Sequence, residues 1–142
     1  MACPRIMCCI PTYKRTWQFV QMIAINCVLA WKLRDVVTFV VADLNDDWEA
    51  DVELALDMCA AAAQCGMLRR FRRALPESDG WRYWHASVGK NCAHVAAINV
   101  AAGDGVVLVE LDNDNFVSEQ FFDDILENAE ELRGHANHGR SE

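Results

Sequence analysis

The sequence lacks the signals of several large protein classes. It has only 3 prolines and 7 glycines in 142 residues, and 53% of its residues are hydrophobic, which excludes a collagen-like or low-complexity chain. No apolar run reaches the roughly 18 residues of a membrane-spanning helix, because Asn26, Lys32 and Arg34 interrupt the longest one. The first residues also lack the order of a secretory signal. We therefore expect one soluble, cytoplasmic domain without a membrane span.

Glycine-rich phosphate loops are absent as well. Neither G-x-G-x-x-G nor G-x-x-x-x-G-K-[ST] occurs, which argues against a dinucleotide enzyme or a P-loop protein. The 7 cysteines form no C-x-x-C pair and are odd in number, so their spacing predicts neither a disulfide framework nor a zinc site. We interpret them as small buried hydrophobic residues.

Basic residues are fewer than acidic ones and are unevenly placed along the chain. The whole sequence has 13 basic and 21 acidic residues, a net charge of −8, which argues against nucleic-acid binding. Residues 104–131 contain no basic side chain, whereas basic residues outnumber acidic ones in residues 1–42. An acidic cluster can still bind an anionic ligand when a divalent cation lies between them.

Four hydrophobic runs recur along the chain, at residues 6–10, 36–42, 67–71 and 106–111. Each of the three gaps is long enough for a helix and its turns, which predicts βαβ units. We therefore expect an α/β fold with three layers, α/β/α, Rossmann-like, around a mostly parallel sheet of about four strands. The runs at 36–42 and 106–111 are continuous rather than alternating, which is typical of central strands covered on both faces.

Apolar residues at helical spacing predict the intervening helices. In the first, the stripe includes Trp17, Ile23, Cys27, Val28 and Trp31. In the third, Val88, Cys92, Val95 and Ala96 are expected to face inward. The predicted helices cover about residues 17–31, 46–65, 87–102 and 118–134. One domain then spans residues 1–134, and residues 135–142 form a disordered tail.

Two carboxylates follow the fourth predicted strand, Asp112 and Asp114, in the sequence Leu-Asp-Asn-Asp-Asn. In parallel sheets, ligands collect at the carboxyl ends of the strands. A D-x-D pair there offers oxygen ligands to Mg²⁺ or Mn²⁺ and leaves room for a diphosphate to complete the shell. The alternative is that both residues only cap the following helix.

Other polar residues lie at the same predicted edge. Asp43 ends the second strand, where an acidic side chain can accept hydrogen bonds from a nucleoside. Lys90 opens the third helix and can reach a phosphate, whereas His94, one turn later, is interpreted as structural. Arg70 belongs to an arginine cluster at residues 69–73 that fits either an anion patch or the charged edge of the sheet, and we favour the edge.

These residues form three motifs, at residues 9–15, 40–43 and 90–115. In this order the sequence resembles the N-terminal, nucleotide-sugar-binding half of an inverting, family-two type GT-A glycosyltransferase. The segment from Lys90 to Phe116 is the most specific, because a helix, a small residue pair, Gly-Asp, a hydrophobic strand and D-x-D follow at the family's spacing. The resemblance covers about residues 5–133.

The resemblance implies a domain that binds a nucleoside-diphosphate sugar through Mg²⁺ or Mn²⁺. Pro11 and Thr12 would line the base pocket, and Asp112 would face the ribose or sugar as well as the metal, which Asp114 would ligate. The resemblance also implies donor-binding roles for the three residues Arg15, Asp43 and Lys90.

The sequence departs from the family in two places. Asp43 is followed by Leu-Asn-Asp-Asp rather than by a second acidic residue at once. The acceptor half and its general-base carboxylate do not follow the fourth predicted helix, where Asp123, Asp124 and Glu127 are interpreted as a solvated face. We therefore expect a half-domain that is inactive alone, is completed by a missing C-terminal half or forms a homo-oligomer. The alternative is a non-catalytic α/β module that binds a nucleotide or a partner.

Overall fold

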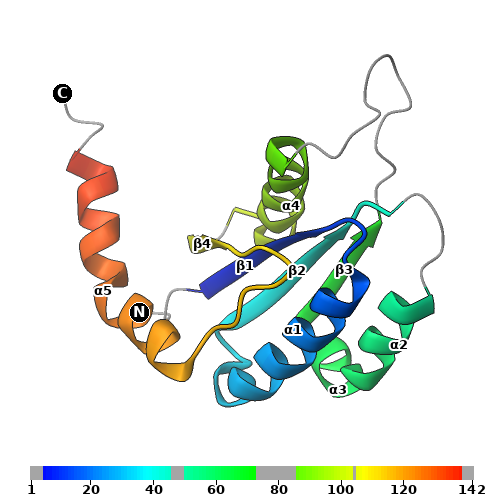
Figure 1. The fold of residues 1–142 in the computed structure, drawn as a ribbon. Coiled ribbons are helices and arrows are strands. Elements are labelled where there is room, and N and C mark those ends of the chain that lie inside the picture. Colours follow the sequence, from blue (N-terminus) through cyan, green and yellow to red (C-terminus); the bar gives the residue numbers. More distant parts are fainter. Residues whose placement is uncertain (1–4, 46–49, 73–85, 104, 139–142) are drawn as a thin grey trace.

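A computed structural model describes residues 5–45, 50–72, 86–103 and 105–138 (Figure 1). Parts of several predictions lie outside these residues: Cys3, residues 46–49 at the start of the second predicted helix, Arg73 of the arginine cluster, Asp104, and residues 139–142 of the predicted tail. The elements follow one another in the order β1 (Arg5–Thr12), α1 (Thr16–Leu29), a 3-10 turn (Trp31–Leu33), β2 (Val37–Asp43), α2 (Ala50–Met58), α3 (Ala60–Gln64), β3 (Leu68–Arg72), α4 (Ala86–Ala101), β4 (Val106–Glu110) and α5 (Glu119–His138).

The four strands form one all-parallel sheet in the order β3-β2-β1-β4. Helix α4 covers one face of the sheet, and α1, α2 and α3 cover the other (Figure 1). The predicted α/β fold with a parallel, Rossmann-like sheet between helices is therefore confirmed. This topology brings the carboxyl ends of β1, β2 and β4 to the same edge.

Alternating side chains explain why the central strands are buried on both faces. Along β1, Ile6, Cys8 and Ile10 pack on the α1 side of the sheet, while Met7 and Cys9 pack under α4. Every residue of β2 is buried, as predicted for a central strand. The same prediction is wrong for β4, which lies at the edge of the sheet and is only partly buried. A continuous hydrophobic run does not specify how many neighbours a strand has.

The first helix exposes apolar residues that the sequence stripe was expected to bury. Trp17 is 71% exposed and Val28 is 76% exposed, whereas Phe19 and Met22 are fully buried. No residue of Thr16–Leu29 is charged, so both faces of α1 have an apolar stripe and periodicity does not distinguish them. Even so, no helix within the described residues is long and apolar enough to cross a membrane.

Three further helix predictions differ from the structure. The second predicted helix is interrupted at Cys59 and becomes α2 and α3. On α4, Cys92 is buried as predicted, but Val95 is exposed because Ala93 and Ala97 occupy the inward face instead. The last helix continues to His138, beyond the predicted end at residue 134 and into the predicted tail.

The start of α5 closes the α1 side of the core. Phe122 is fully buried and meets Phe39 of β2 edge to face, with 6.3 Å between the ring centroids. The acidic residues Asp123, Asp124 and Glu127 are exposed, as predicted for a solvated face. The start of α5 thus packs on the core through its apolar side.

Most cysteines behave as small hydrophobic residues. Five are buried, whereas Cys65 is exposed, contrary to the prediction; the buried ones are Cys8, Cys9, Cys27, Cys59 and Cys92. Burial raises the pKa of Cys9 to about 12, with a smaller contribution from the charge of Glu110. The pKa of Cys8 is raised further by the same cause, so neither strand thiol is ionised near neutral pH.

Candidate functional site

The end of β1 forms the floor of the candidate site. Pro11 and Thr12 are buried, and the Thr12 carbonyl accepts a hydrogen bond from the Leu44 N–H at 2.9 Å. The side-chain amide of Asn113 donates to the Thr12 hydroxyl at 3.4 Å. Thr12 therefore ties the segments that follow β2 and β4 to β1, and its hydroxyl faces protein.

The end of β2 is a buried charge network. Asp43 is 2% exposed, and its Oδ1 accepts hydrogen bonds from the backbone and side-chain N–H groups of Asn45 at 3.1 and 2.8 Å. Its Oδ2 accepts from Nε and Nη2 of Arg70 at 3.1 and 2.5 Å. Arg70 also forms an ion pair with Glu53 of α2. Both oxygens of Asp43 are thus engaged within the protein.

Asn45 extends this network to the loop after β1. Its Oδ1 accepts a hydrogen bond from the Lys14 backbone N–H at 2.6 Å. Lys14 and Arg15 both have left-handed backbone conformations, with φ of 52° and 50°, which side chains rarely adopt. The bond to Asn45 helps to hold this unfavourable loop, and the loop presents Arg15 to the edge of the sheet.

The end of β4 forms a tight turn with a fixed backbone. The Asp112 N–H donates to Asn115 Oδ1 at 2.9 Å, and the Asn115 N–H donates to the Asp112 carbonyl at 3.1 Å. Asn26, fully buried in α1, donates to the Asn115 carbonyl and accepts from the Val117 N–H, both at 3.0 Å. One asparagine therefore anchors the segment that carries the D-x-D pair.

The two D-x-D carboxylates are solvent-accessible and loosely paired. The side chain of Asp112 is 58% exposed, and its Oδ1 lies 3.8 Å from Lys90 Nζ of α4. The side chain of Asp114 is 39% exposed, and its Oδ2 lies 3.4 Å from Arg15 Nη1. Exposed pairs at such distances contribute little to stability, so they exchange partners readily.

Glu110, the last residue of β4, is the principal partner of Lys90. Its Oε1 lies 2.9 Å from Lys90 Nζ, and its Oε2 lies 3.7 Å from Nε2 of His94. The hydrogen bond and charge of Glu110, with a smaller contribution from Asp112, raise the pKa of Lys90. Lys90 therefore stays cationic beside the D-x-D turn at neutral pH.

The donor set suits a hard divalent cation only when a ligand completes it. Within the described ranges, no group of three or more histidine, cysteine, aspartate and glutamate side chains is placed to hold a metal. Asp112 and Asp114 offer carboxylate oxygens, which Mg²⁺ and Mn²⁺ prefer. Mg²⁺ is commonly bound by one or two carboxylates together with substrate phosphates, and Asp112 and Asp114 are residues of the type that this arrangement needs.

The structure brings some of the predicted site residues into contact and separates others. Arg15 meets Asp114, and Lys90 meets Asp112, from elements far apart in the sequence. Asp43 is turned toward β3 instead. The sequence does not mark Glu110, Asn26 and Asn45 as site residues, because no motif assigns them a role. In the structure Glu110 contacts Lys90, Asn26 holds the segment after Asp114, and Asn45 holds the loop that carries Arg15.

Weak signals of these partners were present in the sequence. Asn26 is a polar residue on an otherwise apolar helix face, and Glu110 is a charge at the end of a hydrophobic strand. Arg70 was interpreted as part of the charged edge strand, and β3 is indeed at the edge. Its pairing with Asp43 depends on strand register, which the sequence does not give.

Comparisons of the chain with protein-family models, curated proteins and solved structures found no match.

Proposed function

We propose that this chain binds a nucleoside-diphosphate sugar through Mg²⁺ or Mn²⁺, as a glycosyltransferase-type donor-binding domain. The observation that carries the proposal is the alternation of charge at one edge of the sheet. Two accessible carboxylates, Asp112 and Asp114, each lie beside a basic side chain from another element, Lys90 and Arg15. A metal–diphosphate complex has the complementary charges, because its cation attracts the carboxylates and its phosphate oxygens attract the basic side chains.

In this proposal the weak ion pairs exchange for stronger ligand contacts. Asp112 and Asp114 would hold the cation, while Lys90 and Arg15 would bind oxygens of the diphosphate. The bound cation would offset the charge that develops on the leaving diphosphate. Because Lys90 is kept cationic by Glu110, it remains a phosphate partner over the whole neutral range.

Asp43 has an indirect role in the proposal. Its predicted contact with a nucleoside requires one of its bonds to Asn45 or Arg70 to open. With those bonds in place, Asp43 holds Asn45, and Asn45 holds the loop that presents Arg15. We therefore assign it a positioning role for the phosphate contact.

The first experiment measures donor binding with and without the metal. We expect UDP-glucose or GDP-mannose to bind in Mn²⁺, and the affinity to fall at least about tenfold in excess EDTA, because the carboxylates then repel the diphosphate. We expect Asp114→Ala to abolish binding in Mn²⁺. Isothermal titration calorimetry on the full chain gives each affinity directly.

A matched control is available on α5. Asp123→Ala also removes one exposed carboxylate, but it lies on the solvated helix face and should leave the affinity unchanged. Equal affinity in Mn²⁺ and EDTA would overturn the metal role. If neither nucleotide sugar binds in Mn²⁺, the donor-binding proposal itself is wrong.

A further inference from the structure

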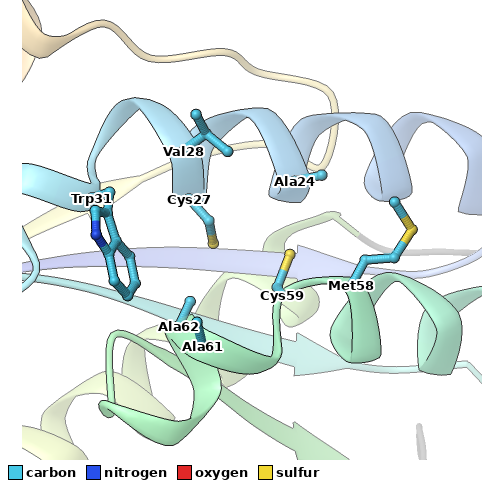
Figure 2. Close-up of a pocket in the computed structure, with 8 residues that line it drawn as sticks. All are labelled: Ala24, Cys27, Val28, Trp31, Met58, Cys59, Ala61 and Ala62. Carbon is cyan, nitrogen blue, oxygen red and sulfur yellow. The ribbon is translucent and has the colours of Figure 1, made fainter.

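An apolar groove lies between α1 and the α2–α3 pair, away from the D-x-D turn (Figure 2). Its volume is about 460 Å³. Eight residues line it, none of them charged: Ala24, Cys27, Val28, Trp31, Met58, Cys59, Ala61 and Ala62. The proposed donor site uses none of these residues, so the groove needs a separate explanation.

Two cysteines face each other across this groove. Figure 2 shows the sulfur of Cys27, on α1, directed toward the sulfur of Cys59, at the junction of α2 and α3. Both cysteines line the same groove. Cys27 and Cys59 are 5% and 7% exposed, so the protein shields them without sealing them from the groove.

The break between α2 and α3 sets this juxtaposition. Cys59 is the residue between the two helices, with φ of −100° and ψ of 26°, and it does not continue the helical conformation. Ala61 and Ala62 follow it on the same wall of the groove and are too small to come between the sulfurs (Figure 2). The interruption that sequence periodicity did not predict therefore coincides with the thiol pair.

The nearness of the two thiols makes them chemically unequal. The neighbouring Cys27 thiol lowers the pKa of Cys59, because an S–H group beside it stabilises the Cys59 thiolate. The neighbouring Cys59 thiol, with burial, raises the pKa of Cys27. Cys59 is thus the better nucleophile of the pair, and Cys27 is its neighbouring resolving thiol.

We propose that Cys27 and Cys59 form a reversible dithiol–disulfide site that reacts with hydroperoxides or small disulfides. With hydrogen peroxide, the Cys59 thiolate attacks one oxygen, the O–O bond breaks, and a sulfenic acid forms while hydroxide leaves and is protonated to water. The Cys27 sulfur then attacks the Cys59 sulfur, the S–O bond breaks and a second water leaves. Two thiols are oxidised to one disulfide, and the peroxide is reduced to two waters.

The bridge would join α1 to the α2–α3 junction across the groove. Both segments pack on the same face of the sheet, so little of the fold has to move. A cross-link between segments distant in sequence restricts the unfolded chain and is expected to raise the midpoint of thermal unfolding. A thiol reductant should return the protein to its starting state.

The test treats the full chain with hydrogen peroxide and maps its peptides under non-reducing conditions. We expect an intact mass lower by two hydrogen atoms, a Cys27–Cys59 linked peptide, and loss of both after reduction. Cys65→Ser should leave the linkage unchanged, since Cys65 is exposed and does not line the groove. Cys92→Ser is a second control, because that thiol belongs to α4 and is buried against the opposite face of the sheet.

The variants Cys27→Ser and Cys59→Ser should each lose the linked peptide and the rise in thermal midpoint. If one of them fails to fold, the other and the wild-type peptide map still decide the question. A Cys59–Cys65 linkage, or only disulfides between chains, would overturn the proposal. So would Cys27 and Cys59 that both remain free thiols after a treatment that oxidises Cys65.

Discussion

The ends of β2 and β4 look alike in sequence and differ in the structure. Each hydrophobic strand is followed by acidic and amide residues, with Asp43 at one and Asp112 and Asp114 at the other. Asp43 is buried and its two oxygens accept four hydrogen bonds. The D-x-D carboxylates are exposed and each meets a basic group at 3.4 Å or more.

Neighbouring strands account for the difference. β2 is central, so the edge strand β3 places Arg70 beside Asp43 and buries the pair. β4 is itself at the edge, and the side chains of Asp112 and Asp114 beyond it are exposed. A buried charge with complete partners holds the fold together, whereas an accessible one with weak partners is available to a ligand.

The largest effect should come from breaking the buried pair. Asp43→Asn removes the negative charge beside Arg70. It also replaces one of the two acceptor oxygens of Asp43 by an NH2 group, which cannot accept the hydrogen bonds that this oxygen accepts. We expect a loss of about 3 kcal/mol in the free energy of unfolding, because the largely buried Arg70 loses one of its carboxylate partners, although its ion pair with Glu53 remains. Urea denaturation followed by circular dichroism measures the loss.

The same substitution at the other strand end is the matched control. Asp112→Asn changes an exposed carboxylate into the same amide and should cost less than about 1 kcal/mol. Equal losses for the two variants would remove the distinction between the strand ends. An Asp43→Asn variant as stable as the wild type would show that the fold does not depend on the bonds of Asp43, so that these bonds could open for the nucleoside contact that the resemblance implies.

The fold was predictable because it depends on patterns within single segments. Four hydrophobic runs separated by helix-length gaps are enough to give a parallel α/β sheet, and they did. The order of the strands was not predicted, because Val106 to Glu110 is as hydrophobic as a central strand and yet lies at the edge. Which face of α1 is buried was also hidden, since an uncharged helix has no polar side to mark it.

The candidate site was predictable only as a set of strand ends. Arg15, Lys90 and the D-x-D pair follow from the rule that parallel strands present their carboxyl ends together. The residues that contact them in the structure could not be predicted, because these contacts join segments that are far apart in the sequence. Glu110 and Asn26 gain their roles from contacts across the fold that no local motif records.

A smaller effect should come from removing Asn26, the residue that anchors the D-x-D turn to α1. Asn26→Ala removes both hydrogen bonds to the turn and leaves the Asn115 carbonyl and the buried Val117 N–H without that partner. We expect a loss of about 2 kcal/mol in unfolding free energy, measured by urea denaturation. Asn128→Ala removes an exposed asparagine from α5 and should change stability by less than about 0.5 kcal/mol. If the two variants are equally stable, the turn is held by its own internal bonds alone.

The smallest effect concerns the charge beside the D-x-D turn. Because Glu110 raises the pKa of Lys90, the pair stabilises the folded state at neutral pH, and this contribution is lost as the pH rises through the raised pKa of Lys90. Glu110→Gln should therefore lower the pKa of Lys90 toward its ordinary value and reduce stability slightly below that pH, with no difference above it. An NMR titration of the lysine side-chain carbons measures the shift, and Glu119→Gln, which removes the carboxylate near Lys32, is the control. A Lys90 pKa that stays the same in Glu110→Gln would show that the D-x-D turn, rather than the strand end, governs this cation.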